Sequence, residues 1–416
     1  MPNLIINIYN NKLNFGRQFI MKRKIIYLLS VLIIVAACKK ILPKATPDDE
    51  LLDGPVEGLS TGETKQFLAG DIAFNSEVFT DETGLGPVFV ANSCGSCHAG
   101  DGKGHPFTTL TRFGQTDTSG NKYLHLGGPQ LQNRAIPGYT PESLPANVGF
   151  VKILPPANTG LGYLDAVSDA DILNMADPLD QNGDGISGIP NWVKVPAYCQ
   201  LRAGAITKNG KHIGRFGKKG AAYDLLQQTA NAYSQDMGIN SSYEPYDTYS
   251  GLEQDPEVSN ETVNAVVFYL KTLKAPSQRN QKEADVVAGK QLFISAGCEK
   301  CHRSELKTGP SNINVLANKV FYPYTDLLLH DMGSALDDHY TEGSATTAEW
   351  RTPALWGLGL SKNSQGGNYF LMHDGRAKSI REAILLHGGE GQNSTSNFKN
   401  LSESEQQKLI RFLESL

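Results

Sequence analysis

The sequence predicts a mostly α-helical fold with two similar domains, the first enlarged by a long loop-rich insertion. Three observations support this prediction. The pattern Cys-x-x-Cys-His occurs twice, beginning at Cys94 and at Cys298. Apolar residues with helical spacing precede the second copy and also close each half of the chain. Within the first half, residues 114–255 are dense in Gly, Pro and Asn and show few helical periods.

Composition describes an ordinary globular protein. The 416 residues are 19% charged and 40% hydrophobic, which suits two or three domains. The formal net charge is −5, and no basic run occurs outside residues 22–24. Because a nucleic-acid-binding protein needs a concentration of basic side chains, we expect no nucleic-acid partner.

Residues 1–38 have the features of a bacterial export signal. From Met21, the expected start, basic residues 22–24 precede the apolar residues 25–37. This stretch is shorter than the roughly 20 residues that span a bilayer. The small residues before Cys38 resemble a lipobox, so we expect lipidation of Cys38. An uncleaved anchor helix is the alternative.

Residues 39–59 are polar and Pro-rich, as in a tether between a lipid anchor and a folded domain. The expected location is therefore the cell envelope, as a lipoprotein that faces the periplasm or the cell surface.

The two Cys-x-x-Cys-His patterns predict covalent haem. Two thiols three positions apart can bond to the vinyl groups of a porphyrin while the adjacent histidine ligates its iron. A thioredoxin-like pair and half of a zinc site are alternatives, but no further Cys or His pairs follow at zinc-ligand spacing. Two covalently bound haem c groups are thus predicted. Their attachment residues and iron ligands are Cys94, Cys97 and His98, and Cys298, Cys301 and His302.

Helices frame each motif. In residues 261–273, four apolar side chains fall at helical spacing, and Pro276 ends the segment. A second helix is expected over residues 284–296, directly before Cys298, and a third at the C-terminus after a capping box. Helix, motif and closing helix form the plan of a small cytochrome c domain. The predicted boundaries are residues 60–276 for the N-terminal haem domain with its insertion and 281–416 for the C-terminal domain.

One further helix carries a candidate iron ligand. Ser379 and Glu382 form a capping box, and Gly388 supplies a stop signal. Ile380, Ala383, Ile384 and His387 share one face of this helix, predicted over residues 379–389. His387 is then either a core residue bonded to backbone or an axial ligand of iron.

The insertion contains a candidate calcium loop. Asp180, Asn182 and Asp184 alternate before a glycine, and Ser187 lies beyond it. Alternating oxygen donors before a glycine match the first half of a calcium-binding loop. The twelfth position holds Asn191 instead of a bidentate glutamate. A loop closed by Asx turns is therefore an equal alternative to calcium.

Three other residues have two interpretations each. Cys199 is left over after lipid and haem attachment, and it is expected to be a small hydrophobic residue rather than a reactive thiol. Arg351 and Arg376 are candidates for pairing with haem propionates, with surface ion pairs as the alternative.

Longer motifs carry a family resemblance. The segment 324–391 contains DLLLHDMG, EWRTPALWGLG and FLMHDGRAKSIREAILLHGGEG, and the preceding chain contains QLQNRAIPG, NGDGISG, GRFG and DMGI. These motifs resemble the di-haem oxidoreductase family, also described as thiol oxidoreductases. That family is similar to the bacterial di-haem cytochrome c peroxidases and to MauG.

The resemblance implies a ligand set for the second haem. His373 takes the place of the family's HDG histidine, and His387 takes the axial place. The second haem would then be bis-histidine, with His302 below and His387 above. Such coordination is saturated, favours electron transfer over substrate binding and lowers the potential relative to a methionine ligand. Met332, Met372 and His330 are the alternative ligands.

The resemblance leaves the first haem less defined. His98 should be proximal, while the distal position is either open or taken by one of several residues. These are His105, His125, His212, Met175 and Met237. No counterpart of the peroxidases' FWDGR-type motif is present, and Glu142 is the candidate catalytic acid or base only by its place in the sequence.

The predicted function is that of a haem-dependent oxidoreductase. Electrons would enter at the C-terminal haem, from a small electron-transfer protein, and be used at the N-terminal haem on peroxide or another small redox substrate. The alternative is a non-catalytic di-haem carrier between envelope partners. Thiol oxidation has no support in these residues beyond the family label.

Overall fold

The structure is a computed structural model that describes residues 47–114, 121–123 and 129–416. Residues Asp49–Leu416 form one compact unit. The signal segment and Cys38 lie outside the described residues, as does the first part of the predicted tether. Within the described part of the chain, no helix combines the length and the apolar character that crossing a membrane requires.

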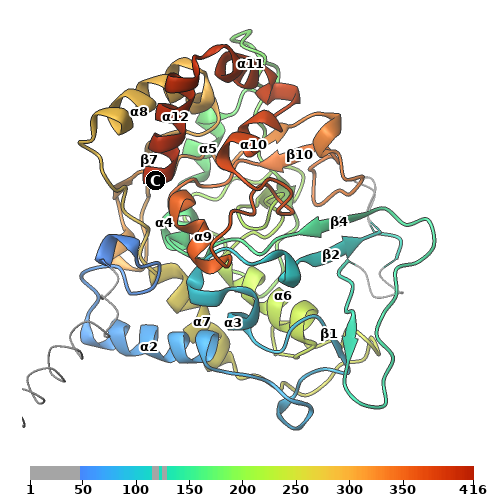
Figure 1. The fold of residues 1–416 in the computed structure, drawn as a ribbon. Coiled ribbons are helices and arrows are strands. Elements are labelled where there is room, and N and C mark those ends of the chain that lie inside the picture. The colour runs from blue at the N-terminus through green and yellow to red at the C-terminus, as the bar shows by residue number, and fades with distance from the viewer. Residues whose placement is uncertain (1–46, 115–120, 124–128) are drawn as a thin grey trace, which may run out of the picture. The chain divides into compact units, whose positions relative to one another are not determined.

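Helices are the longest elements, which confirms the mostly α prediction (Figure 1). They are α2 (Thr61–Asn75), α3 (Cys94–Cys97), α4 (Leu161–Asp165), α5 (Asp169–Met175), α6 (Leu225–Met237), α7 (Asn260–Thr272), α8 (Ala284–Ser295), α9 (Ser361–Ser364), α10 (Ile380–Leu385), α11 (Gln392–Asn400) and α12 (Glu403–Ser415).

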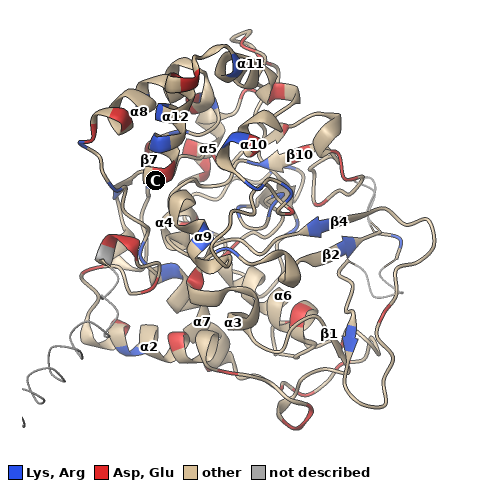
Figure 2. Cartoon of the chain, viewed as in Figure 1, with Lys and Arg blue, Asp and Glu red and all other residues tan. Residues whose placement is uncertain are grey.

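The strands pair only two at a time, in antiparallel ladders. The pairs are β1 (Val88–Phe89) with β3 (Arg134–Ala135), β2 (Leu110–Phe113) with β4 (Phe150–Ile153), β5 (Trp192–Val193) with β6 (His212–Ile213), β7 (Leu306–Lys307) with β8 (Val320–Phe321), and β9 (Leu329–Asp331) with β10 (Glu349–Arg351). Figure 2 shows basic and acidic residues interspersed over the helices and loops of the chain.

Helices α2 and α7 cross at a glycine in the N-terminal half. A Cβ atom added to Gly70 would collide with the carbonyl oxygen of Ala265 and lie 2.6 Å from Cβ of Tyr269. Only glycine therefore allows the two helices to approach this closely. Ser60 and Glu63 cap α2 reciprocally, and Ser259 caps α7 by accepting from Thr262 N–H.

The same crossing recurs between α8 and α12 in the C-terminal half. A Cβ atom on Gly289 would collide with the carbonyl oxygen of Lys408 and lie 2.7 Å from Cβ of Phe412. In both crossings the glycine contacts a backbone carbonyl of the partner helix and the aromatic side chain four residues further along that helix. The two helix pairs lie at opposite ends of the unit in Figure 1. In each pair the first helix precedes a Cys-x-x-Cys-His motif, α2 before Cys94 and α8 before Cys298.

The hydrophobic core consists of clusters that belong to one half of the chain and clusters that combine residues of both halves. One cluster draws only on residues 67–273 and another only on residues 286–416. A third combines residues 164–213 with residues 306–328, and a fourth packs Val151 with Tyr340 and Trp350. The predicted boundary at residues 276–281 therefore remains a prediction, while the core itself crosses between the halves.

Two elements differ from the expectation. The loop-rich insertion contains α6, which begins at the N-cap Asp224 and ends at Gly238 in left-handed geometry. Helix α10 ends at Leu385, so His387 follows the helix and does not extend its stripe. After the helix, Gly389 packs against the Asp331 carbonyl, where a side chain would collide.

We predict that Gly70→Ala lowers the free energy of unfolding by about 1–3 kcal/mol, because the added methyl group must separate α2 from α7. The matched control is Gly62→Ala in the same helix, where nothing lies within 4 Å. That control should be neutral or stabilising by up to about 1 kcal/mol. Denaturant unfolding of the two variants checks the difference, and equal stabilities would refute the close crossing.

Candidate functional site

One cavity of about 710 Å³ contains both cysteine motifs. Residues Cys94, Cys97 and His98 line it together with Cys298, Cys301 and His302. All four of these cysteines are free in the structure. Segments far apart in the sequence thus converge on a single cavity.

The cysteine thiols are unsuited to thiol redox chemistry. Burial raises the pKa of Cys94 to about 12, that of Cys97 to about 11 and that of Cys298 to about 12. A reactive thiol needs a lowered pKa, because the thiolate is the nucleophile. The thioredoxin-like alternative therefore finds no support in this environment.

Each motif histidine is held by one backbone carbonyl. Nδ1 of His98 donates to the carbonyl oxygen of Pro156 at 2.9 Å, and Nδ1 of His302 donates to that of Tyr324 at 2.9 Å. Burial lowers the pKa of both rings to about 4, so both are neutral at pH 7. A neutral imidazole with Nδ1–H bonded to a carbonyl keeps Nε2 as a free metal ligand.

His387 has the same arrangement. Its Nδ1 donates to the carbonyl oxygen of Ala383 at 2.7 Å, it lines the cavity, and burial lowers its pKa. The ring lies close enough to His302 that each positive charge would disfavour the other. His387 is therefore a second neutral imidazole with an available Nε2 near the C-terminal motif.

The alternative ligands at this end are less suited. His330 is bonded through both ring nitrogens to carboxylates, Asp326 and Glu390, and has no nitrogen left for a metal. His373 stacks on Trp350 with ring centroids 3.7 Å apart and bonds through Nε2 to Asp338. Met332 and Met372 line the cavity and remain alternatives.

At the N-terminal motif, most of the proposed distal residues point elsewhere. Met175, His105 and His212 do not line the cavity: the ring of His105 packs on Phe370, and His212 packs on a tyrosine. His125 lies outside the described residues. Of the described candidates, Met237 alone lines the cavity, where it also belongs to the hydrophobic core.

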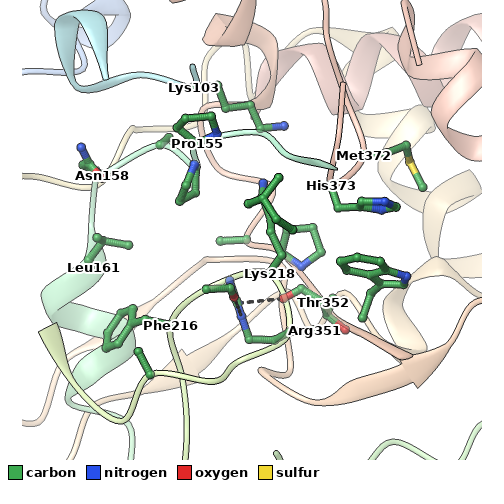
Figure 3. Close-up of a pocket in the computed structure, with 18 of the residues that line it drawn as sticks. Lys103, Pro155, Asn158, Leu161, Phe216, Lys218, Arg351, Thr352, Met372 and His373 are labelled. Carbon is green, nitrogen blue, oxygen red and sulfur yellow. Dashed lines mark hydrogen bonds between the residues drawn. The ribbon is translucent and has the colours of Figure 1, made fainter. Parts of the chain in front are cut away.

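Three cations face the cavity without an acidic partner. Figure 3 shows Lys103, Lys218 and Arg351 around the same part of it. Within the described residues, neither lysine Nζ has a hydrogen bond or ion pair, whereas Arg351 donates to the carbonyls of Gly217 and Thr352 at 3.2 and 3.1 Å. Burial lowers the pKa of Lys103 to about 8 and that of Arg351 to about 10. Burial and the positive charges of Lys103 and Arg351 lower the pKa of Lys218 strongly.

Two buried polar atoms at the same cavity also have no hydrogen-bond partner in the part of the chain that the structure describes. They are Nδ2 of Asn158 and Oγ1 of Thr159, and their residues are 5% and 1% exposed. Buried polar groups in native proteins are almost always hydrogen-bonded. Together with the unpaired cations, these donors indicate an anionic group that the cavity is built to hold.

Two predicted site residues lie outside the cavity lining. Arg376 forms ion pairs with Asp374 and Asp338 at 2.8 and 3.1 Å. These contacts agree with the predicted alternative, an ion pair, rather than with pairing to a haem propionate. Glu142 accepts a hydrogen bond from Gln132 N–H at 2.6 Å, and burial raises its pKa to about 7. Its catalytic role remains a prediction.

The candidate calcium loop is closed by its own backbone. Asp180 accepts from the N–H groups of Asp184 and Gly185, and Asn182 also accepts from Asp184 N–H, all within 3.0 Å. Ser187 bonds to Glu390. Asn191 is buried and bonded to the backbone carbonyls of Lys219 and Glu342, so it does not complete the loop. These contacts describe an Asx-turn loop, and calcium remains a prediction.

Two outcomes complete the comparison with the predicted residues. Cys199 is half-buried, 3.4 Å from an Asp224 carboxylate oxygen, and its pKa is raised by burial. Sequence reasoning missed Lys103 and Lys218. Both lie in short segments flanked by glycines, GKG and GKKG. This flanking pattern is the sequence feature that the two lysines share.

The sequence comparison decides the family. A family model described as "Di-haem oxidoreductase, putative peroxidase" matches residues 148–416. The chain belongs to the di-haem oxidoreductase family. The resemblance inferred from the motifs is thereby confirmed, although the first cysteine motif lies before the matched residues.

Other comparisons are more distant. No curated protein matches the chain. Among solved structures, hydrazine synthase of Kuenenia stuttgartiensis is 15% identical, with a TM-score of 0.40 over 90% of this chain and 98% of that one. The di-haem peroxidase BthA of Burkholderia thailandensis is 16% identical, with a TM-score of 0.40 over 89% of each chain.

The residues fit the two haems that the family implies. Neutral imidazoles with free Nε2 suit iron, and the unpaired cations and amide suit propionates. In this arrangement His98 and His302 would hold the irons, and Lys103, Lys218, Arg351 would hold carboxylates of the macrocycles.

We predict that Lys218→Met lowers the free energy of unfolding of the haem-loaded protein by about 1.5–3 kcal/mol, because a buried haem carboxylate loses its charged partner. Exposed Lys282→Met should change it by less than about 0.5 kcal/mol. Urea unfolding followed by the Soret band measures both. A Lys218→Met protein more stable than the wild type would show that the ammonium has no anionic partner.

Proposed function

We propose that the protein is a di-haem c-type oxidoreductase in which the C-terminal haem receives electrons and the N-terminal haem uses them. The haems are attached through thioether bonds at the two cysteine pairs. Each haem lies in a cytochrome c-like domain with its own helix pair. The substrate is peroxide or another small redox molecule. The electron donor is a small electron-transfer protein.

One observation carries this proposal: the two ends of the shared cavity offer different ligand sets. At the C-terminal end, His302 and His387 both present a free Nε2. At the N-terminal end, His98 does so, and of the described residues predicted as its distal partner only Met237 lines the cavity. A saturated centre transfers electrons, and an open one binds substrate.

The chain's own residues divide the work accordingly. Bound haem supplies one-electron transfer and, where its iron is open, reaction with peroxide. Pro156 and Tyr324 orient the proximal imidazoles through their carbonyls. The cations between the two ends neutralise buried carboxylates.

The location in the cell is part of the same proposal. Export and lipidation at Cys38 would tether the protein in the envelope, where haem is attached to such motifs. Calcium at Asp180, Asn182, Asp184 and Ser187 would be an accessory ion, with the Asx-turn loop as the alternative.

We predict that His387→Gly converts one low-spin haem signal to high-spin, because the second imidazole is lost. Electron paramagnetic resonance of the oxidised, haem-loaded protein measures this directly. In the wild type we expect one low-spin and one high-spin centre together with hydrogen peroxide turnover. Two low-spin centres without turnover would establish the electron carrier instead, and an unchanged spectrum in His387→Gly would refute the axial assignment.

We predict that Glu142→Gln slows the reaction with peroxide on the order of 10²-fold or more, the usual contribution of a general base. The pKa of Glu142 is raised to about 7, so its carboxylate forms as the pH rises through 7. The wild-type rate should rise over that range, and the variant rate should not. Stopped-flow kinetics against pH tests this.

Glu257→Gln is the control for that experiment. Glu257 also accepts a backbone N–H, from Asn240 at 2.8 Å, and it does not line the cavity. Equal rates in the two variants would remove Glu142 from the catalytic machinery.

A further inference from the structure

A buried triad of charges lies against the C-terminal cysteine motif. Nε2 of His330 is 2.9 Å from Oδ2 of Asp326, and Nδ1 is 2.7 Å from Oε2 of Glu390. The three side chains are 4%, 2% and 13% exposed. Ionised carboxylates only accept hydrogen bonds, so both ring nitrogens must carry hydrogen.

His330 is therefore an imidazolium between two carboxylates. Burial alone would lower its pKa, but hydrogen bonds with Asp326, Cys301 and Glu390 outweigh burial and raise the pKa to about 12. The triad as a whole holds one net negative charge, two carboxylates against one imidazolium.

The triad touches the haem-binding residues from two directions. Nδ1 of His330 lies 3.6 Å from Sγ of Cys301, and both His330 and Glu390 line the cavity. Glu390 follows His387 by three positions. The next residue, Gly391, packs against the His387 side chain so closely that an added Cβ atom would lie 2.9 Å from Cβ of His387. The charges are thus fixed beside both the attachment point and the axial ligand.

Glu390 is held rigidly by three segments of the chain. Its carboxylate accepts from Ser187 Oγ at 2.6 Å, from Ser187 N–H at 3.1 Å and from Asp331 N–H at 3.3 Å, besides the bond to His330. With this set of donors the carboxylate stays ionised, and the pKa of Glu390 is accordingly lowered even though burial opposes it. The loop of the insertion, strand β9 and the axial-ligand turn meet at this one group.

A metal ion does not account for the cluster. In the described part of the chain, Cys301, Asp326 and His330 are the group with metal-ligand spacing. Both nitrogens of His330 are occupied by the carboxylates, and the imidazolium already supplies the positive charge. The triad is a fixed group of buried charges. Ligation of the haem iron does not explain why these three side chains are placed together.

We propose that Asp326, His330 and Glu390 are positioning residues that lower the reduction potential of the C-terminal haem. A fixed negative charge in a buried site opposes the arrival of an electron, because charges interact strongly where the dielectric is low. The triad makes this centre a stronger electron donor to the rest of the cavity. The inference rests on the proposed haem at Cys298 and Cys301 with His302 and His387 as ligands.

The test is a spectroelectrochemical titration of the haem-loaded protein at pH 6, where the imidazolium retained by Asp326 stays charged. Glu390→Gln keeps the size of the side chain and removes its charge, so the midpoint potential of the low-spin haem should rise. Asp326→Asn should shift it in the same direction. The midpoint of the other haem should move less in both variants.

Glu299→Gln is the matched control, since Glu299 belongs to the same cysteine motif but bonds to Ser304 and lies outside the triad. Its midpoint should stay near the wild-type value. An unchanged midpoint in Glu390→Gln overturns the proposal, as does a shift of equal size in Glu299→Gln. Should Glu390→Gln fail to bind haem, Asp326→Asn decides by the same criterion.

Spectra separate this result from the proposed function. Retention of the low-spin resonance signal in Glu390→Gln shows that His387 still ligates, so the shift is electrostatic. Loss of that signal would mean that Glu390 only supports the ligand turn, and the electrostatic role would be rejected. Wild-type protein without covalent haem or without a low-spin centre would instead refute the proposed function.

Discussion

The structure depends on a large internal space that its own side chains do not fill. Protein interiors are normally close-packed, and unfilled volume costs stability. Here a cavity of about 710 Å³ runs past both cysteine motifs, and within the described residues Lys103 and Lys218, which line it, have no acidic partner. The two haems of the proposed function would fill this volume and bring carboxylates to the lysines. Cofactor binding would then be coupled to folding.

The halves of the chain are joined through groups that also define the site. Arg351 N–H donates to the carbonyl of Lys218, which puts cations from both halves side by side. Lys300, within the second cysteine motif, pairs with Asp184 of the insertion at 3.1 Å. A substitution at this junction would alter the geometry of the haem centres together with the packing of the halves. The loop-rich insertion thus contacts the C-terminal motif, although in sequence it follows the first motif directly.

Local patterns predicted the parts of this protein that local physics determines. The capping box of α12 fixes its start, and the apolar stripe of α7 fixes its buried face, so both elements could be predicted from residue order. The Cys-x-x-Cys-His motifs likewise encode their chemistry within five residues. Helix α6 was missed because Thr229 and Ser234 contribute to its buried face, and these residues carry no apolar signal. The cation cluster and the triad were beyond sequence reasoning, since each joins residues brought together only by the tertiary fold.

The distribution of fixed charge gives the two centres different tasks. Lys218, which has no ion-pair partner within the described residues, is near enough to His98 to disfavour its protonation. The triad at the other end holds a net negative charge beside Cys301. Positive charge stabilises a reduced haem, and negative charge stabilises an oxidised one. Under the proposed function, an electron that arrives at the C-terminal haem would therefore move to the N-terminal haem, whose reduction potential would be the higher of the two.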